Sequence, residues 1–306
     1  MQNFLTVGQQ VLILFILILT GYALGKKQII GEAAGKALSD IALLLSTPCV
    51  IALSFEREFS VAVIKDLGFA VLMALAVHLI AIGVAQVLYR KNTPRDRVLR
   101  ASAVLSNAGF MGLPLQQAVL GEQGVFYGAA YVTVFTLTLW SYGLLTMDTS
   151  SRRLSAKKLF INPGVIGLVA GMVILLMPFE LPTLIRTPMQ HLGNLNTPIP
   201  MLFIGYSLSK VDLGRALRNR SYYLACAVRL LLVPVISIGI LYLCGLRGTL
   251  LCSMAIAGSA PIAAAVSMFA NRYGQDTETS ANLVALSTVF SVITMPIFVA
   301  LVQSIA

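Results

Sequence analysis

Charged side chains are scarce in this chain of 306 residues. Only 11% of the residues are Asp, Glu, Lys or Arg, whereas 58% are hydrophobic. Because a soluble domain carries about 25% charged residues, this composition excludes a soluble globular protein. Apolar runs recur from one end of the chain to the other, beginning with Val11–Leu19. The composition therefore predicts an all-α polytopic membrane protein with no sizeable soluble domain.

Histidine and cysteine are also rare. The chain has only two histidines, His78 and His191, and contains neither a Gly-x-Gly-Asp nor a His-Glu-x-x-His motif. An intramembrane hydrolase would need such a cluster, so we do not expect an enzyme. The four cysteines lack metal-ligand spacing, and we expect them to be small core residues: Cys49, Cys226, Cys244 and Cys252. No metal or other cofactor is expected.

Basic residues outnumber acidic residues by 22 to 12, which gives a net charge of +10. They lie in short loops between apolar runs and form no continuous face, so nucleic acid is not an expected partner. The first apolar run is followed by Lys26 and Lys27, with no cleavage site after it. We therefore expect a retained membrane span rather than a signal peptide.

A membrane-spanning helix needs about 20 largely apolar residues. By this criterion the sequence predicts ten spans, at about 7–25, 37–55, 66–89, 98–120, 124–147, 161–178, 189–209, 221–244, 248–270 and 279–303. Counted from the first, the odd-numbered loops hold 17 of the 22 basic residues, and the even-numbered loops hold four. The positive-inside rule therefore places both termini outside the cytoplasm and the central loop inside it. We expect the plasma (inner) membrane as the location.

The two halves of the chain echo each other. Ser46-Thr47-Pro48 resembles Asn196-Thr197-Pro198 at an offset of 150 residues, and Pro114 matches Pro261 at an offset of 147. An odd number of spans per half gives the halves opposite topology. We therefore expect a 5+5 inverted repeat, with one repeat at 1–150 and the other at 151–306, a known plan for carriers.

Two apolar segments are interrupted where a membrane-spanning helix is expected. They are Ser106–Leu120 (beginning SNAGFMGLPL) and Gly258–Phe269 (GSAPIAAAVSMF), and both contain glycine, proline and small polar residues. Proline removes a backbone donor, and freed backbone groups are tolerated at membrane depth only inside protein or beside a water-filled cavity. A matched pair of broken helices predicts a central binding site. The alternative is two proline kinks in ordinary packed helices.

Helices broken at mid-membrane would turn positive dipole ends toward the gap, which suits a carboxylate. Asn107 supplies an amide, Ser106, Ser259 and Ser267 supply hydroxyls, and Gly109 and Gly112 allow close approach. For Asn107 the alternative is an interhelical hydrogen bond. For Ser267 it is a bond to its own helix carbonyl.

Two ionisable residues lie inside predicted spans and are candidates for coupling or gating, namely His78 and Arg229. His78 is suited to relay a proton, although a neutral packing histidine is the simpler interpretation. Arg229 stabilises an anion path, or it pairs with backbone carbonyls and an acidic side chain. Adjacent mid-membrane aspartates are absent, which argues against a dedicated sodium–proton antiporter.

At these residues the chain resembles the auxin efflux carrier family in its compact bacterial form. Ser106–Leu115 is similar to the crossover motif of the fourth helix, and Ala260-Pro261 with Phe269–Gly274 to that of the ninth. The further matching segments are Gly21-Tyr22 with Gly25, Ile161–Gly167, Arg229–Pro234 and Gly245–Gly248. The resemblance covers nearly the whole chain.

The resemblance implies ten helices with crossed, broken helices 4 and 9. It implies a scaffold of helices 1, 2, 6 and 7, a mobile domain of the other six, and homodimers formed through the scaffold. It also implies export of organic anions by an elevator motion. Bacterial relatives are linked to small carboxylates such as malonate, so auxin is not the expected substrate. The long central loop of many plant carriers is missing.

The sequence thus predicts a secondary transporter, embedded in membrane lipid, that exports a small organic anion (a carboxylate) across the membrane. The alternative is a sodium- or proton-coupled symporter of the same architecture, and a passive channel is a further possibility. The expected substrate-binding residues are Asn107, Gly109, Phe110, Gly112, Pro114, Ser259, Pro261 and Ser267.

Overall fold

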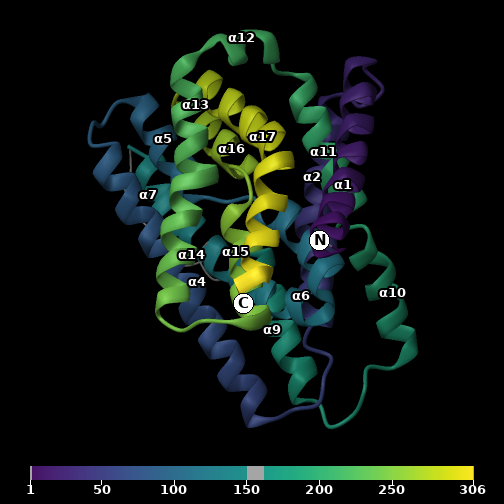
Figure 1. The fold of residues 1–306 in the computed structure, drawn as a ribbon. Helices are drawn as coiled ribbons and strands as arrows, with labels where there is room; N and C mark the ends of the chain where they lie inside the picture. Colours follow the sequence, from purple (N-terminus) through teal and green to yellow (C-terminus); the bar gives the residue numbers. More distant parts are fainter. Residues whose placement is uncertain (1, 150–161, 306) are drawn as a thin grey trace.

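The computed structural model describes residues 2–149 and 162–305, which form helices joined by short connections (Figure 1). The first part contains α1 (Gln2–Lys26), α2 (Glu32–Ile41), η1 (Ala42–Ser46), α3 (Thr47–Leu53), α4 (Val61–Leu88), α5 (Pro94–Val104), η2 (Ala108–Gly112), α6 (Leu113–Thr138), η3 (Leu139–Gly143) and α7 (Leu144–Met147). The second contains α9 (Pro163–Leu176), α10 (Thr183–Asn194), α11 (Pro198–Ser209), α12 (Leu213–Arg218), α13 (Arg220–Ala227), η4 (Val228–Leu232), α14 (Val233–Leu243), α15 (Gly248–Ser259), α16 (Ala264–Arg272) and α17 (Thr277–Ile305). The basic residues of the expected central loop, and the expected boundary between repeats, lie outside the described residues.

Six of the described helices are long and apolar enough to cross a membrane, which confirms a polytopic helical protein. They are Gly8–Lys26, Glu32–Leu53, Val61–Leu88, Ala108–Met147, Arg220–Leu243 and Thr277–Ile305. The other apolar segments form shorter or interrupted helices, such as α9 and α15. Each interruption needs partners for its backbone groups if it lies in hydrocarbon.

The longest of these helices folds back on itself at Gly121, where φ is 63° and ψ is −153°. A Cβ added to Gly128 would lie 1.9 Å from Oε1 of Gln116. Twelve residues of straight helix would separate these positions by about 18 Å. Residues 108–120 and 122–147 are therefore two antiparallel helices, as the expected spans 98–120 and 124–147 require.

Prolines follow π-helical turns at three places in the chain. The turns η1, η2 and η4 each end two residues before a proline, which is the second residue of the next helix: Pro48, Pro114 and Pro234. Proline has no N–H to donate, and its ring clashes with the carbonyl four residues earlier. The wider π turn relieves that clash while the helix continues.

The echoing motifs of the two halves meet in the structure. The Thr47 hydroxyl donates a hydrogen bond to Oδ1 of Asn196 over 3.0 Å, and both side chains are buried. The offset of 150 residues noted in the sequence therefore relates two segments that touch.

Glycines bring α1 and α11 into backbone contact. A Cβ on Gly205 would lie 2.0 Å from the Ile18 carbonyl oxygen, and one on Gly21 would lie 2.3 Å from the Leu202 carbonyl oxygen. Neither backbone atom can rotate away as a side chain would. Only glycine fits these two positions, and the pair determines how closely the helices approach.

We predict that Gly205→Ala destabilises the protein, because the new methyl group must push α1 and α11 apart. Overpacking of this kind costs about 1–3 kcal/mol. The matched control is Gly239→Ala in α14, where an added Cβ meets nothing within 4 Å. Thermal unfolding of purified protein in detergent should show a lower melting temperature for Gly205→Ala alone. Equal melting temperatures for the two variants would contradict the proposed contact.

Candidate functional site

Two extended segments cross between helix halves. The helix α5 ends at Val104 and η2 begins at Ala108, while α15 ends at Ser259 and α16 begins at Ala264. Ser106 and Ile262 form an isolated antiparallel bridge between the two gaps. The expected interruption of both segments is present in the structure.

The crossing strands satisfy each other's backbone groups. The Asn107 N–H donates to the Pro261 carbonyl over 2.7 Å, and the Ala263 N–H donates to the Leu105 carbonyl over 2.9 Å. The Ile262 N–H donates to the Ser287 hydroxyl over 3.1 Å. Both breaks are thereby stabilised without solvent.

The expected match between Pro114 and Pro261 is wrong in its register. Pro261 lies in the break itself, whereas Pro114 lies in the first turn of α6, after the helix has resumed. The residues that face each other are Ser106 and Ile262. The helix resumes six residues before Pro114 because the π turn η2 accommodates the proline ring.

Asn107 stands at the N-terminal end of the helix that follows the first break. Its backbone carbonyl accepts bonds from the Met111 and Gly112 N–H groups, but its side chain does not cap the helix. The side chain is 6% exposed and forms no hydrogen bond with another described residue. Beside it, a Cβ on Gly109 would meet nothing within 4 Å. The Asn107 amide therefore lies at an uncapped helix N-terminus without a partner among the described residues, and the interhelical bond considered for its side chain is not formed.

The N-terminus of α16 is the second uncapped helix end at the crossing. Ala263 has no side chain that could cap it, and the first N–H groups of a helix have no partner within the helix. The helices η2 and α16 thus both begin at the crossing, and their positive N-terminal ends favour negative charge there.

Arg229 lies at the opposite, negative ends of the broken helices. Nε donates to the Ala260 carbonyl over 3.1 Å, Nη1 to Ala103 over 3.2 Å, and Nη2 to Gly258 over 2.5 Å. The side chain is only 1% exposed. Of the two roles considered for Arg229, the structure has the pairing with backbone carbonyls, and no acidic side chain among the described residues pairs with it.

His78 packs behind the crossing through Tyr131. The two ring centroids are 4.8 Å apart, and the Ser106 hydroxyl donates weakly to the Tyr131 hydroxyl over 3.4 Å. Nδ1 of His78 lies 2.8 Å from the Ala74 carbonyl, whereas Nε2 is buried without a partner in the described part of the chain. His78 therefore lies one side chain away from the crossing.

The remaining predicted residues lie in η2, at the end of α15 and in α16. Phe110 and Gly112 belong to η2, and Gly112 packs beside α15 without requiring glycine, since an added Cβ would lie in ordinary contact, 3.6 Å from the Ala257 Cα. Ser259 is fully buried, and its hydroxyl bonds its own helix at the Ile256 carbonyl. Ser267 accepts a long hydrogen bond from Ser280 and lines a cavity described next.

Two cavities flank the crossing along α11. The first has a volume of about 310 Å³ and lies between α3, α6 and α10, where Pro114 lines it with Asn196 and Thr197. The second has a volume of about 390 Å³ and lies between α11, α16 and α17, where Ser267 and Ala264 line it with Lys210. We call them the α10 cavity and the α11–α16 cavity. Because α11 begins beside one and ends beside the other, they lie at opposite ends of this helix.

Apolar side chains pack between η2 and α11. The rings of Phe110 and Phe203 meet edge to face, with centroids 6.1 Å apart. Around them Met111, Met201 and Ile204 are almost fully buried in one cluster. Phe203 also lines the α11–α16 cavity, so this apolar contact borders that cavity.

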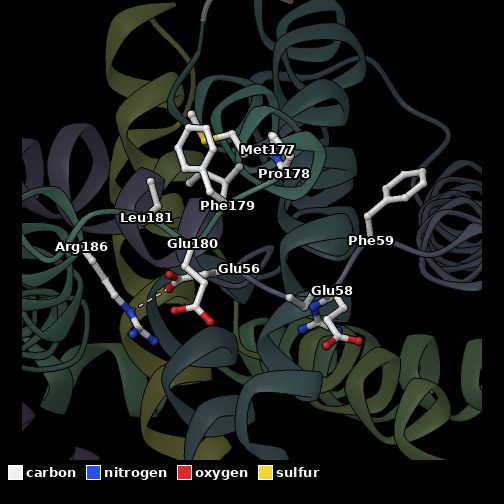
Figure 2. Close-up of a pocket in the computed structure, with 11 residues that line it drawn as sticks. Glu56, Glu58, Phe59, Met177, Pro178, Phe179, Glu180, Leu181 and Arg186 are labelled. Carbon is white, nitrogen blue, oxygen red and sulfur yellow. Dashed lines mark ion pairs between the residues drawn. The ribbon is translucent and has the colours of Figure 1, made fainter.

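A larger hollow of about 650 Å³ lies beyond the α10 cavity, between the α3–α4 and α9–α10 connections (Figure 2). Arg186 pairs with Glu56 there over 2.9 Å. Arg57 holds the Ser54 carbonyl and the Gln123 side chain and stacks on Phe126, and burial lowers its pKa. Both arginines of this hollow thus have partners, and its lining also includes the acidic residues Glu58 and Glu180.

The sequence did not predict three sets of groups that form hydrogen bonds at the crossing. Ser287 and Tyr131 carry no local signal, because their partners lie 25 residues away in the chain. The third is the set of backbone carbonyls that accept from Arg229, which any residue type could supply.

Two cysteines take the expected core positions, Cys226 and Cys252, whereas Cys244 is exposed. The described residues contain no group of three or more His, Cys, Asp or Glu side chains that could hold a metal ion.

Comparison with known proteins gives one family over almost the whole chain. The sequence pattern described as membrane transport protein matches residues 6–299. An uncharacterized transporter of Methanothermobacter thermautotrophicus is 24% identical over 296 residues, covering 95% of this chain and 96% of that protein. An uncharacterized transporter of Methanocaldococcus jannaschii is 23% identical over 301 residues, covering 94% and 96%.

We predict that Ser287→Ala destabilises the protein, because the Ile262 N–H at the crossing would lose its acceptor. A buried donor left unsatisfied costs about 1–3 kcal/mol. Ser304→Ala near the C-terminus is the control, since that exposed hydroxyl only bonds its own helix. Thermal unfolding in detergent measures both variants, and no loss in Ser287→Ala relative to Ser304→Ala would contradict the assignment.

Proposed function

Because this chain belongs to the membrane transport protein family, we propose that it is a secondary transporter that exports a small organic anion bearing a carboxylate. The observation that carries this proposal is the pair of uncapped helix N-termini at the crossing, beside the free Asn107 amide. Helix N-termini bind anions through their unpaired N–H groups and the helix dipole. The substrate-binding set proposed around Asn107 is Gly109, Phe110, Gly112, Pro114, Ser259, Pro261 and Ser267.

The charge of the α11–α16 cavity supports an anionic substrate. Lys210 is the one ionisable side chain with a formal charge among its lining residues, and none of those residues is acidic. The α10 cavity instead contains Glu56 and Glu122 together with Arg186. A carboxylate would therefore enter from the α11–α16 side and meet the N-terminus of α16 there.

The proposed direction, export, rests on the expected orientation of the chain and on entry of the substrate through the α11–α16 cavity. Lys210 and Arg220 flank α12, which ends at Arg218. This helix lies at one end of the molecule, and the α9–α10 connection lies at the other (Figure 1). The positive-inside rule assigns the α12 end to the cytoplasm. The α11–α16 cavity then faces the cytoplasm, and both termini are assigned to the outside of the plasma membrane.

The proposed architecture is ten crossings arranged as a 5+5 inverted repeat. The Thr47–Asn196 contact and the Ser106–Ile262 bridge support it, because each joins the two halves near their echoing motifs. The reversal at Gly121 supports it by separating the fourth and fifth crossings. The two cavities lie between α3, α10 and α11 on one side and α6, α16 and α17 on the other. An elevator motion of the second group along the first would expose the crossing to each cavity in turn.

Homodimerisation through the scaffold (expected helices 1, 2, 6 and 7, which correspond to α1–α3 and α9–α11) is part of the proposal. The helices α1 and α9 present exposed apolar side chains, among them Ile16, Leu19, Ile166 and Val169. Lipid or a second copy would cover these side chains.

The second candidate function is a sodium- or proton-coupled symporter of the same architecture. The unpartnered Nε2 of His78 favours the proton form, which dependence of flux on a pH gradient would reveal.

We predict that Asn107→Ala abolishes saturable carboxylate flux in proteoliposomes, because the substrate loses its amide partner. Folding should be unaffected, since the Asn107 side chain makes no hydrogen bond with another described residue. The control is Asn92→Ala in the α4–α5 connection, where the side chain is exposed. Unchanged kinetics in Asn107→Ala would remove this residue from the site.

We also predict that Lys210→Gln weakens the apparent affinity for the anion while leaving the maximal rate intact. The loss of one positive charge at the cavity should raise KM by up to about tenfold, or ~1.4 kcal/mol. Lys26→Gln is a matched control, because Lys26 stacks on Tyr22 as Lys210 stacks on Tyr206 but lies outside the cavity. Equal KM values for the two variants would exclude a role for Lys210 in attracting the substrate.

A further inference from the structure

The carbonyls that Arg229 binds belong to both broken helices. Ala103 lies in the last turn of α5, Gly258 lies in the last turn of α15, and Ala260 lies in the extended segment that follows α15. The last carbonyls of a helix have no partner within the helix. One guanidinium therefore serves the C-terminal ends of two helices that come from opposite halves of the chain.

The charges at this position balance. Each helix C-terminus is equivalent to roughly half a negative elementary charge. Two such ends together amount to about one negative charge, which a single guanidinium neutralises. This accounts for an arginine that is 1% exposed and has no acidic partner among the described residues. Its other polar neighbours are the Tyr131 hydroxyl and the His78 ring.

The same arrangement of carbonyls suits a free cation. In carriers built on discontinuous helices, unwound backbone carbonyls and half-helix C-termini coordinate the coupling Na⁺. Arg229 already brings one positive charge to such carbonyls here. A sodium ion at the same place would find its ligands occupied and would be repelled by the guanidinium.

We propose that the Arg229 guanidinium is a built-in cation that takes the place of a coupling Na⁺ at the crossing, so that transport is independent of sodium. This inference rests on the proposed function for its consequence in transport, but the occupancy of the carbonyls by a cation is a property of the folded protein alone. It excludes the sodium-coupled form of the symporter and leaves the proton-coupled form open.

The first test uses the wild-type protein. Its melting temperature in detergent should be the same in sodium chloride and in choline chloride at equal ionic strength. Saturable carboxylate flux in proteoliposomes should persist when choline replaces Na⁺ on both sides. A melting temperature raised by Na⁺, or flux that stops without Na⁺, would overturn the proposal.

The second test removes the guanidinium from the carbonyls that it binds. Arg229→Ala should lose thermal stability, and Na⁺ or a low concentration of guanidinium should raise its melting temperature by about 2 °C or more relative to choline. Arg229→Lys, which keeps a cation, should be more stable than Arg229→Ala and should show no such rise. Arg247→Ala is the control, because Arg247 also binds backbone carbonyls but at the exposed α14–α15 connection.

The outcomes separate the two proposals. If neither Na⁺ nor guanidinium raises the melting temperature of Arg229→Ala, the proposal of a built-in cation is overturned, whatever the carboxylate flux. If Arg229→Ala does not fold, the wild-type comparison between sodium and choline still decides. An absence of carboxylate flux, with the cation effects as expected, would instead refute the proposed substrate class and keep the role of Arg229.

Discussion

The exchange of backbone hydrogen bonds between Asn107 and Pro261, and between Leu105 and Ala263, is the contact on which the rest of this structure depends. A helix interrupted within hydrocarbon exposes N–H and C=O groups that lipid cannot satisfy. Neither break is stable alone, but each supplies the partners that the other lacks. The two halves of the chain must therefore assemble together, and a central irregular segment becomes possible where a continuous helix would otherwise be required.

The crossing also separates charge. Arg229 neutralises the C-terminal ends of α5 and α15, whereas the N-terminal ends at η2 and α16 have no cap. The local field is consequently one-sided, with positive helix ends beside open space near Gly109 and beside the α11–α16 cavity. Because only the negative helix ends are neutralised, the same hydrogen bonds that stabilise the fold also underlie the proposed preference for an anion. The Phe110–Phe203 contact borders the α11–α16 cavity.

Local chemistry accounts for how much of this could be predicted. Proline, glycine and small polar residues marked both breaks, and Asn107 was predicted as a site residue from its place within the first. The register was not predicted, because Pro114 is absorbed by a π turn while Pro261 lies in the gap. A proline removes a donor in either setting, so its presence does not reveal whether the helix stops or continues. The partners of Arg229 were hidden for a similar reason, since backbone carbonyls have no residue signature.

By itself, the sequence determined the membrane-spanning helical class, the family and the two places where helices must break. The class and the breaks follow from composition and from backbone chemistry within a few neighbouring residues, whereas the family follows from the resemblance of an ordered set of motifs. Only the tertiary structure decided that Ser106 faces Ile262, that Ser287 and Tyr131 support the crossing, and that Arg229 serves two helix ends. These contacts join residues 25 to 156 positions apart in the sequence. Such contacts form only when the packing of whole helices brings the groups together, because no local preference encodes them.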